Sequence, residues 1–137
     1  MPHLERPQHR LYFEETGSGS AILLGHSFFC SGEMWRYQVP ALAESYRVVS
    51  LDYRGHGQSS PLREDLRIYD LVEDSVALLD RLCIEQAVWA GLSVGGMTAM
   101  RAAPLTQGGN CCHVGVTGSQ GLARLLYPAA VLDRLPD

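Results

Sequence analysis

The stretch AVWAGLSVGGMTAM, residues 87–100, decides the fold. Its first residues, Ala87–Ala90, form a short apolar run of the kind found in strands buried on both faces of a parallel sheet. The run leads into Gly91-Leu92-Ser93-Val94-Gly95, a G-x-S-x-G pattern, and the residues that follow favour a helix. We interpret the stretch as a strand, a tight turn and a helix, with the hydroxyl of Ser93 exposed at the turn.

Steric crowding explains why the pattern has glycine at positions 91 and 95. A side chain two residues before or after the serine would collide with the neighbouring strand and helix, so Gly91 and Gly95 permit a strained turn. The turn directs the backbone N–H of Val94 and the start of the helix toward the position where an oxyanion would form. Ser93 is therefore the candidate nucleophile, and Val94 is a candidate oxyanion donor.

Three more strands are predicted before this turn. The run Ala21–Leu24 is continuously apolar and ends at Gly25, and Arg47–Leu51 is short and rich in β-branched residues. The alternating segment Arg10–Glu14 predicts an opening strand.

Two helices are predicted between the strands. Proline favours the first turn of a helix, so we expect the first helix to open at Pro40. The second covers Tyr69–Cys83, with Asp70 as its N-cap and Asp74 on its polar side. Alternating strands and helices predict the α/β class, a parallel sheet with helices on both faces.

Three segments together resemble the α/β-hydrolase fold family. They are LLGHSFFCSGEMW (23–35), RVVSLDYRGHGQSS (47–60) and the elbow stretch, and the resemblance covers residues 10–103, the N-terminal half of that fold. It implies acyl transfer through Ser93, with the backbone N–H of Phe28 as the second oxyanion donor. It also implies structural roles for His26, His56 and Asp52.

The residue type of the nucleophile indicates which branch of the family the chain resembles. Epoxide hydrolases and haloalkane dehalogenases of this fold use an Asp at the elbow, whereas this chain has Ser93. The chain looks most like serine esterases and enol-lactone hydrolases, which predicts a small ester, thioester or lactone as substrate.

The residues after the elbow depart from the family. A serine nucleophile needs a base and an acid. The resemblance to the α/β-hydrolase family implies that both follow the serine, the acid first and the histidine after it. After Ser93 the only histidine is His113, and the only acids are Asp133 and Asp137, in the reverse order. We expect the His and Asp of the triad to be missing, and the alternative function is a catalytically inactive fragment or binding remnant.

The chain therefore divides into 1–103, the N-terminal half of a hydrolase core truncated after the elbow, and 104–137, an atypical tail. The tail is either an out-of-frame continuation or a divergent cap segment. The pattern of apolar residues in the tail predicts a weak strand at Val114–Val116 and a short amphipathic helix over 122–132. Without the later strands, an uncovered sheet edge predicts self-association.

Composition supports a globular protein. The 137 residues are 46% apolar and 19% charged, with a net charge of −4, which gives no reason to expect nucleic acid or an anionic membrane as partner. The first ten residues contain no apolar run of a secretory signal, so we expect a cytoplasmic protein. The four cysteines, at positions 30, 83, 111 and 112, fit no metal-binding spacing, and we expect no metal and no cofactor.

Overall fold

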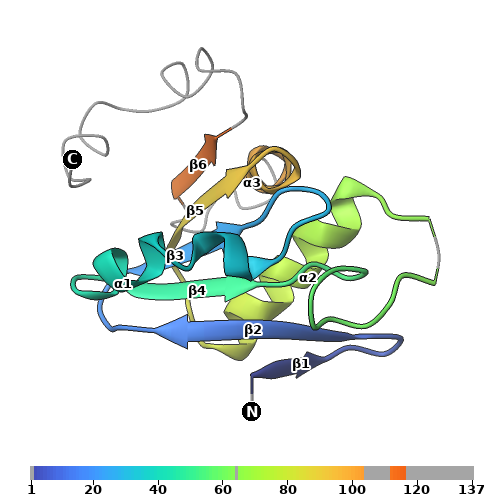
Figure 1. Ribbon diagram of the computed structural model, residues 1–137, viewed down its shortest axis with the longest axis horizontal. Coiled ribbons are helices and arrows are strands. Elements are labelled where there is room, and N and C mark those ends of the chain that lie inside the picture. The colour runs from blue at the N-terminus through green and yellow to red at the C-terminus, as the bar shows by residue number, and fades with distance from the viewer. Residues whose placement is uncertain (1, 64, 104–111, 117–137) are drawn as a thin grey trace.

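A computed structural model describes residues 2–63, 65–103 and 112–116 (Figure 1). The strands are β1 (His3–Glu5), β2 (Arg10–Thr16), β3 (Ala21–Gly25), β4 (Arg47–Leu51), β5 (Ala87–Leu92) and β6 (Cys112–Val116). The helices are the 3-10 helix η1 (Gly32–Trp35), α1 (Gln38–Ala43), α2 (Ile68–Arg81) and α3 (Val94–Ala102).

The described strands form one sheet in the order β1-β2-β4-β3-β5-β6. Strand β3 pairs in parallel with both β4 and β5, and β6 pairs in parallel with β5. Strands β1 and β2 add an antiparallel extension beside β4. The predicted α/β class is confirmed, and the opening strand predicted from Arg10 extends two residues further, to Thr16.

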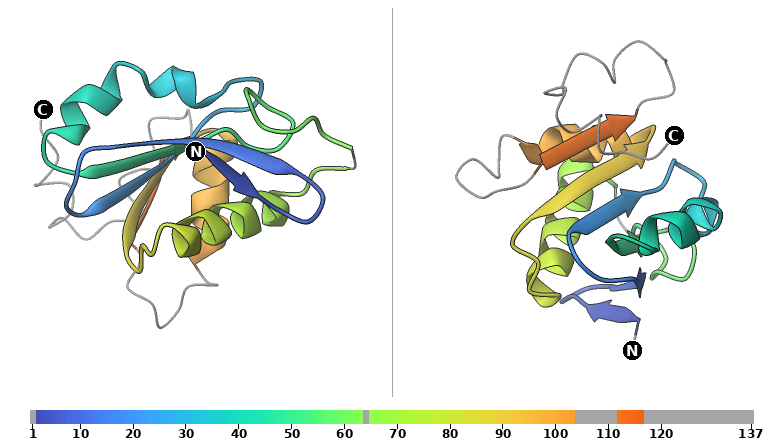
Figure 2. Two further views of the ribbon diagram at one scale, coloured as in Figure 1. Left: turned by 90° about the horizontal axis from the view of Figure 1, so that it is seen from below. Right: turned by 90° about the vertical axis from the view of Figure 1, so that its left-hand side faces the viewer.

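Helices cover both faces of the sheet, as Figure 2 shows. Helices α2 and α3 lie on one face, where Leu78 and Trp89 belong to the larger apolar core. Helix α1 and η1 lie on the other face over a smaller cluster built on Ile22 and Leu24. All five residues of β3 are buried, as its continuous apolar run predicts.

The structure corrects both predicted helix starts. Helix α1 begins at Gln38, so Pro40 is its third residue. The N–H groups of the first turn have no partner within the helix, and proline at this position removes no helical hydrogen bond. Helix α2 has Arg67 as its N-cap, and Asp70 stands three residues later, where its carboxylate accepts a hydrogen bond from the Arg67 N–H at 2.9 Å.

The prediction that Asp74 faces solvent is wrong. Asp74 is fully buried, because the side chains of Arg54, His9 and Arg6 surround its carboxylate. A buried carboxylate is tolerated where cationic and hydrogen-bonding partners replace water.

Helix α3 ends at Ala102, two residues before Pro104, and a proline disfavours helical backbone in the residue that precedes it. The weak strand predicted at Val114–Val116 exists as β6 and begins earlier, at Cys112. It pairs with β5 along five positions, so the expected exposure of the β5 edge is not found. The helix predicted over 122–132 lies outside the described residues. In the part of the chain that the structure describes, no helix has both the length and the apolar character to cross a membrane.

Candidate functional site

Ser93 occupies the junction between β5 and α3. Its backbone angles are φ 54° and ψ −115°, and its side chain is half-buried. A positive φ is unfavourable for a residue with a Cβ and persists only where the surrounding structure enforces it. The strained turn predicted from the G-x-S-x-G pattern is therefore present.

Close backbone packing enforces this turn. A Cβ built on Gly91 would lie 2.3 Å from the carbonyl carbon of Gly95, and a Cβ on Gly95 would lie 2.2 Å from the carbonyl oxygen of Gly25. Real Cβ atoms do not approach backbone this closely, so only glycine fits at either position. Glycine at these two positions therefore avoids the collision with the neighbouring strand and helix that the sequence predicts for a larger residue.

The packing also joins the elbow to the end of β3. Gly25 lies opposite Gly91 in the parallel register, so both strands end at the same edge of the sheet. The loop that follows β3 carries Phe28 and Phe29, whose side chains are 45% and 90% exposed, and Phe29 has a positive φ of 61°. Val94, the first residue of α3, is buried. The roles of Phe28 and Val94 as oxyanion donors remain a prediction.

His26 is a buried structural residue. Its Nε2 accepts a hydrogen bond from the Tyr53 N–H at 2.9 Å, and its Nδ1–H donates to the Ser27 carbonyl at 2.7 Å. Both nitrogens are therefore engaged in the neutral ring. Burial lowers the pKa of His26 from its ordinary 6.5, and the nearby His56 lowers this pKa further. This arrangement matches the loop-ordering role expected from the sequence and excludes His26 as the base for Ser93.

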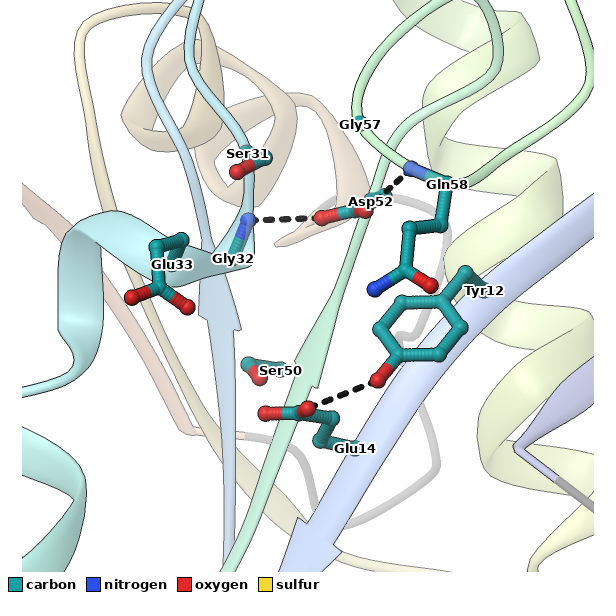
Figure 3. A pocket seen from close by; sticks show the side chains of 9 residues that line it. All are labelled: Tyr12, Glu14, Ser31, Gly32, Glu33, Ser50, Asp52, Gly57 and Gln58. Carbon is teal, nitrogen blue, oxygen red and sulfur yellow. Dashed lines mark hydrogen bonds between the residues drawn. The ribbon is translucent and has the colours of Figure 1, made fainter.

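Asp52 fastens two loops together, as Figure 3 shows. Its Oδ1 accepts a hydrogen bond from the Gly32 N–H at 2.6 Å, and its Oδ2 accepts one from the Gln58 N–H at 2.7 Å. The carboxylate lines a polar cavity of about 80 Å³ near η1, in which the Tyr12 hydroxyl donates to Glu14 at 2.7 Å. Ser93 does not line this cavity. Asp52 holds the turn after β4, as the sequence suggested.

The rest of the turn after β4 is anchored to helix α2 through Arg54. The guanidinium of Arg54 binds the buried Asp74 carboxylate through two bonds, from Nε at 2.7 Å and from a terminal nitrogen at 2.8 Å. The ring of His56 lies edge-on to Phe28 with 5.2 Å between centroids, and its Nδ1–H donates to the Arg54 carbonyl at 3.1 Å. The sequence analysis did not predict the burial of Asp74, although its position between Leu71 and Leu78 on the apolar stripe of α2 indicates it.

No histidine side chain among the described residues forms a hydrogen bond with Ser93. His26 and His56 are held as above, and His9 binds Asp74 at 3.0 Å. The backbone register places His113 of β6 opposite Trp89, four residues before Ser93. At about 3.3 Å per residue this is a separation of roughly 13 Å along the strand, so the position of His113 does not favour it as the base.

The described residues contain no group of three or more His, Cys, Asp or Glu side chains that could hold a metal ion. Cys30 and Cys83 are free and exposed. The cysteines at 111 and 112 lie beyond the residues whose side chains are described. The expectation of no metal and no cofactor stays a prediction.

The fold and the glycine-walled serine turn together define one class of protein. A family model described as the alpha/beta hydrolase fold matches residues 20–108, and the chain belongs to that family.

Its relatives carry out more than one hydrolytic reaction. The chain is 43% identical to bifunctional epoxide hydrolase 2 of Sus scrofa over 97 residues, which are 69% of this chain and 18% of that protein. It is 45% identical to 3-oxoadipate enol-lactonase 1 of Acinetobacter baylyi over 80 residues, 58% of this chain and 30% of that one.

Solved structures agree with these relatives. The fold is similar, with a TM-score of 0.75 and 34% identity, to Est816, described as an N-acyl homoserine lactone degrading enzyme, over 80% of this chain and 42% of that one. It is also similar to the enol-lactonase from Burkholderia xenovorans LB400, with a TM-score of 0.71, 33% identity and coverage of 74% and 41%. The chain thus spans less than half the length of these relatives.

Proposed function

We propose that this protein is a serine hydrolase that transfers an acyl group from a small ester, thioester or lactone to Ser93 and then to water. The observation that carries the proposal is the strained position of Ser93, with φ 54°, between Gly91 and Gly95. Strain of this kind clusters at functional sites, and a turn of this type is expected to present the serine hydroxyl at the end of the strand.

The reaction has two steps. The Ser93 oxygen forms a bond to the carbonyl carbon of the substrate while a base takes its proton, and the carbonyl oxygen becomes an oxyanion. The N–H groups of Phe28 and Val94 are the proposed donors to that oxyanion. Collapse releases the alcohol or thiol, which takes up the proton, and water then hydrolyses the acyl ester on Ser93.

The chemistry of the nucleophile favours acyl transfer over epoxide opening. A carboxylate that opens an epoxide forms an ester, which water can cleave. A serine oxygen that opened an epoxide would form an ether, which water does not cleave, and the enzyme would be consumed. The enol-lactonase and lactone-degrading relatives are therefore better guides to the substrate than the epoxide hydrolases are.

The base and the acid are not assigned to any described side chain. If none is present in this chain, hydrolysis depends on the oxyanion donors and on binding alone. Loss of a triad member leaves a residual acceleration of roughly 10³–10⁴ over water. The proposal therefore predicts slow turnover of activated esters by this chain.

The test combines hydrolysis of p-nitrophenyl acetate with labelling by a fluorophosphonate probe, in the parent and in Ser93→Ala. We expect slow hydrolysis and slow labelling that both disappear in the variant. Turnover on the order of 10 per second would mean that an unassigned base is present. Absence of labelling in the folded parent would favour the alternative, a binding remnant without catalytic activity.

A further inference from the structure

We propose that Arg54, held by the buried carboxylate of Asp74, is a positioning residue for the loop that carries Phe28, and that this pair acts through the His56 ring to help orient the peptide group that contains the Phe28 N–H. The proposal rests on the role of Phe28 as an oxyanion donor in the proposed function. It assigns a purpose to a buried ion pair that lies outside the serine elbow.

The first step is the burial of the pair. Asp74 is fully buried in α2, and Arg54 contacts it through a planar, two-bond geometry that only a guanidinium offers. The hydrogen bonds to Asp74 raise the pKa of Arg54. A terminal nitrogen of Arg54 also approaches the Asp70 carbonyl at 3.4 Å, so the guanidinium contacts α2 at two points.

The second step leads from Arg54 to His56. The carbonyl of Arg54 accepts the Nδ1–H of His56, which fixes the plane of the imidazole ring. The main chain between them turns sharply at Gly55, with φ 80°, and the His56 N–H donates to the Tyr53 carbonyl at 2.9 Å. A shift of Arg54 would therefore move the His56 ring.

The third step leads from His56 to the loop after β3. The His56 ring contacts His26 at 5.1 Å and Phe28 at 5.2 Å between centroids. Phe28 is almost half exposed, and its other aromatic neighbour, Phe29, is 90% exposed and offers little support. The Phe28 N–H shares its peptide group with the Ser27 carbonyl, which accepts hydrogen bonds from the His26 Nδ1–H at 2.7 Å and from the Cys30 N–H at 3.1 Å. The His56 ring contacts both His26 and Phe28, so it supports this peptide group from the inner side, while Val94 belongs to α3.

This asymmetry gives the test. Arg54→Gln alone would leave the buried Asp74 carboxylate with only His9 and Arg6 as partners, and Asp74→Asn alone would leave the Arg54 guanidinium against a neutral side chain. Either single change could unfold the chain, so the main variant is the double change Arg54→Gln with Asp74→Asn. The matched control is Asp80→Asn, which removes the same charge from an exposed position of α2. Thermal melting selects a temperature at which all the proteins are folded.

Two readouts follow on those folded proteins: the ¹⁵N–¹H signals of the Phe28 and Val94 amides, and the rate of Ser93 labelling by a fluorophosphonate. In the double variant we expect the Phe28 signal to move and the Val94 signal to stay. We also expect labelling to slow about tenfold, less than the 10²–10³ that follows loss of a whole oxyanion donor. The control Asp80→Asn should match the parent in the amide signals and in the labelling rate.

Unchanged Phe28 and labelling in the folded double variant would overturn the proposal. Equal displacement of both amides would also overturn it, because it would indicate a general structural role. If the folded parent is not labelled at all, the hydrolase function fails, while the Phe28 signal still decides whether Arg54 positions the loop.

Discussion

Gly95 is the residue where the elbow is least able to accept a change. A Cβ at this position would meet the backbone carbonyls of Gly25 and His26 at 2.2 and 2.9 Å, and backbone cannot move aside as a flexible side chain can. We expect Gly95→Ala to lower the free energy of unfolding by about 1–3 kcal/mol, the usual cost of overpacking, and to abolish labelling of Ser93.

Urea denaturation measures this loss, and Gly32→Ala is the matched control. A Cβ on Gly32 would lie 3.3 Å from the side chains of Asp52 and Ser50, a contact that small adjustments relieve. An equal loss of stability in the two variants would contradict the assignment of Gly95 to the close approach of α3 and β3.

His26 predicts a pH dependence of stability. Its folded pKa lies below the ordinary 6.5, chiefly because the ring is buried, so the unfolded chain takes up a proton at a higher pH than the folded chain does. Its contribution to stability is complete above about pH 6.5 and is lost as the pH falls toward the lower folded pKa. Protonation would also remove the Nε2 acceptor of the Tyr53 N–H.

The measurement is urea denaturation between pH 7.5 and 5 of the parent and His26→Gln. A glutamine offers an oxygen to the Tyr53 N–H but does not titrate, so the variant should lose part of the parent's decline at acid pH. His3→Gln should keep the decline, because His3 lies in β1, away from this buried cluster. Identical pH profiles for the parent and His26→Gln would refute the assignment.

At the scale of the elements, the start of α2 depends on one reciprocal contact. The Asp70 carboxylate accepts the N–H of Arg67 at 2.9 Å and also approaches its guanidinium at 3.1 Å. We expect Asp70→Ala to lower the free energy of unfolding by about 1 kcal/mol, as loss of a helix cap typically does. Thermal melting of this variant and of Glu73→Ala measures the difference. Glu73 is an exposed acid three residues after Asp70, and its loss should have a smaller effect.

The strands could be predicted because their burial leaves a direct signal in the sequence. The runs that became β3, β4 and β5 are short, apolar and bounded by turns, and each was placed within two residues. The three-residue β1 has no such pattern and was missed. Helix starts were misplaced because Pro40 and Asp70 fit more than one position in a first turn, and only tertiary packing selects one.

The site was predictable to a similar extent. The strained turn at Ser93 could be predicted because its steric requirement is local and calls for glycine at positions 91 and 95. The position of Asp74 on the apolar stripe of α2 indicates its burial, but its partners Arg54 and His9 are 20 and 65 residues away in sequence, so the ion pairs themselves could not be predicted. The two proposed oxyanion donors, Phe28 and Val94, are backbone groups, for which side-chain identity carries little information.

At the scale of the whole molecule, the sheet has two kinds of edge. One is β1, only three residues long, and short edge strands resist pairing with other chains. The other is β6, whose five residues pair with β5 on one side and, among the described residues, with no strand on the other. Strand β6 was expected to be weak, yet it pairs with β5, the strand that leads to Ser93. Without β6, that edge of β5 would be unpaired.

The outer side of β6 is therefore where we expect the chain to associate with a second copy of itself. Successive N–H groups of a strand point alternately to its two sides, so of two neighbouring residues one N–H pairs with β5 and the other points outward. Proline removes an N–H. Val114→Pro and Gly115→Pro thus form a matched pair, in which one variant weakens the β5 pairing and the other blocks only the outer edge.

Sedimentation velocity over a range of concentrations, together with urea denaturation, distinguishes the two. We expect the parent to self-associate as concentration rises. One proline variant should lose stability, whereas the other should remain folded and sediment as a monomer. A parent that is monomeric throughout, with a sharp and reversible melting transition, would show that this edge is not available for pairing. Association that persists unchanged in the more stable variant would place the contact elsewhere on the molecule.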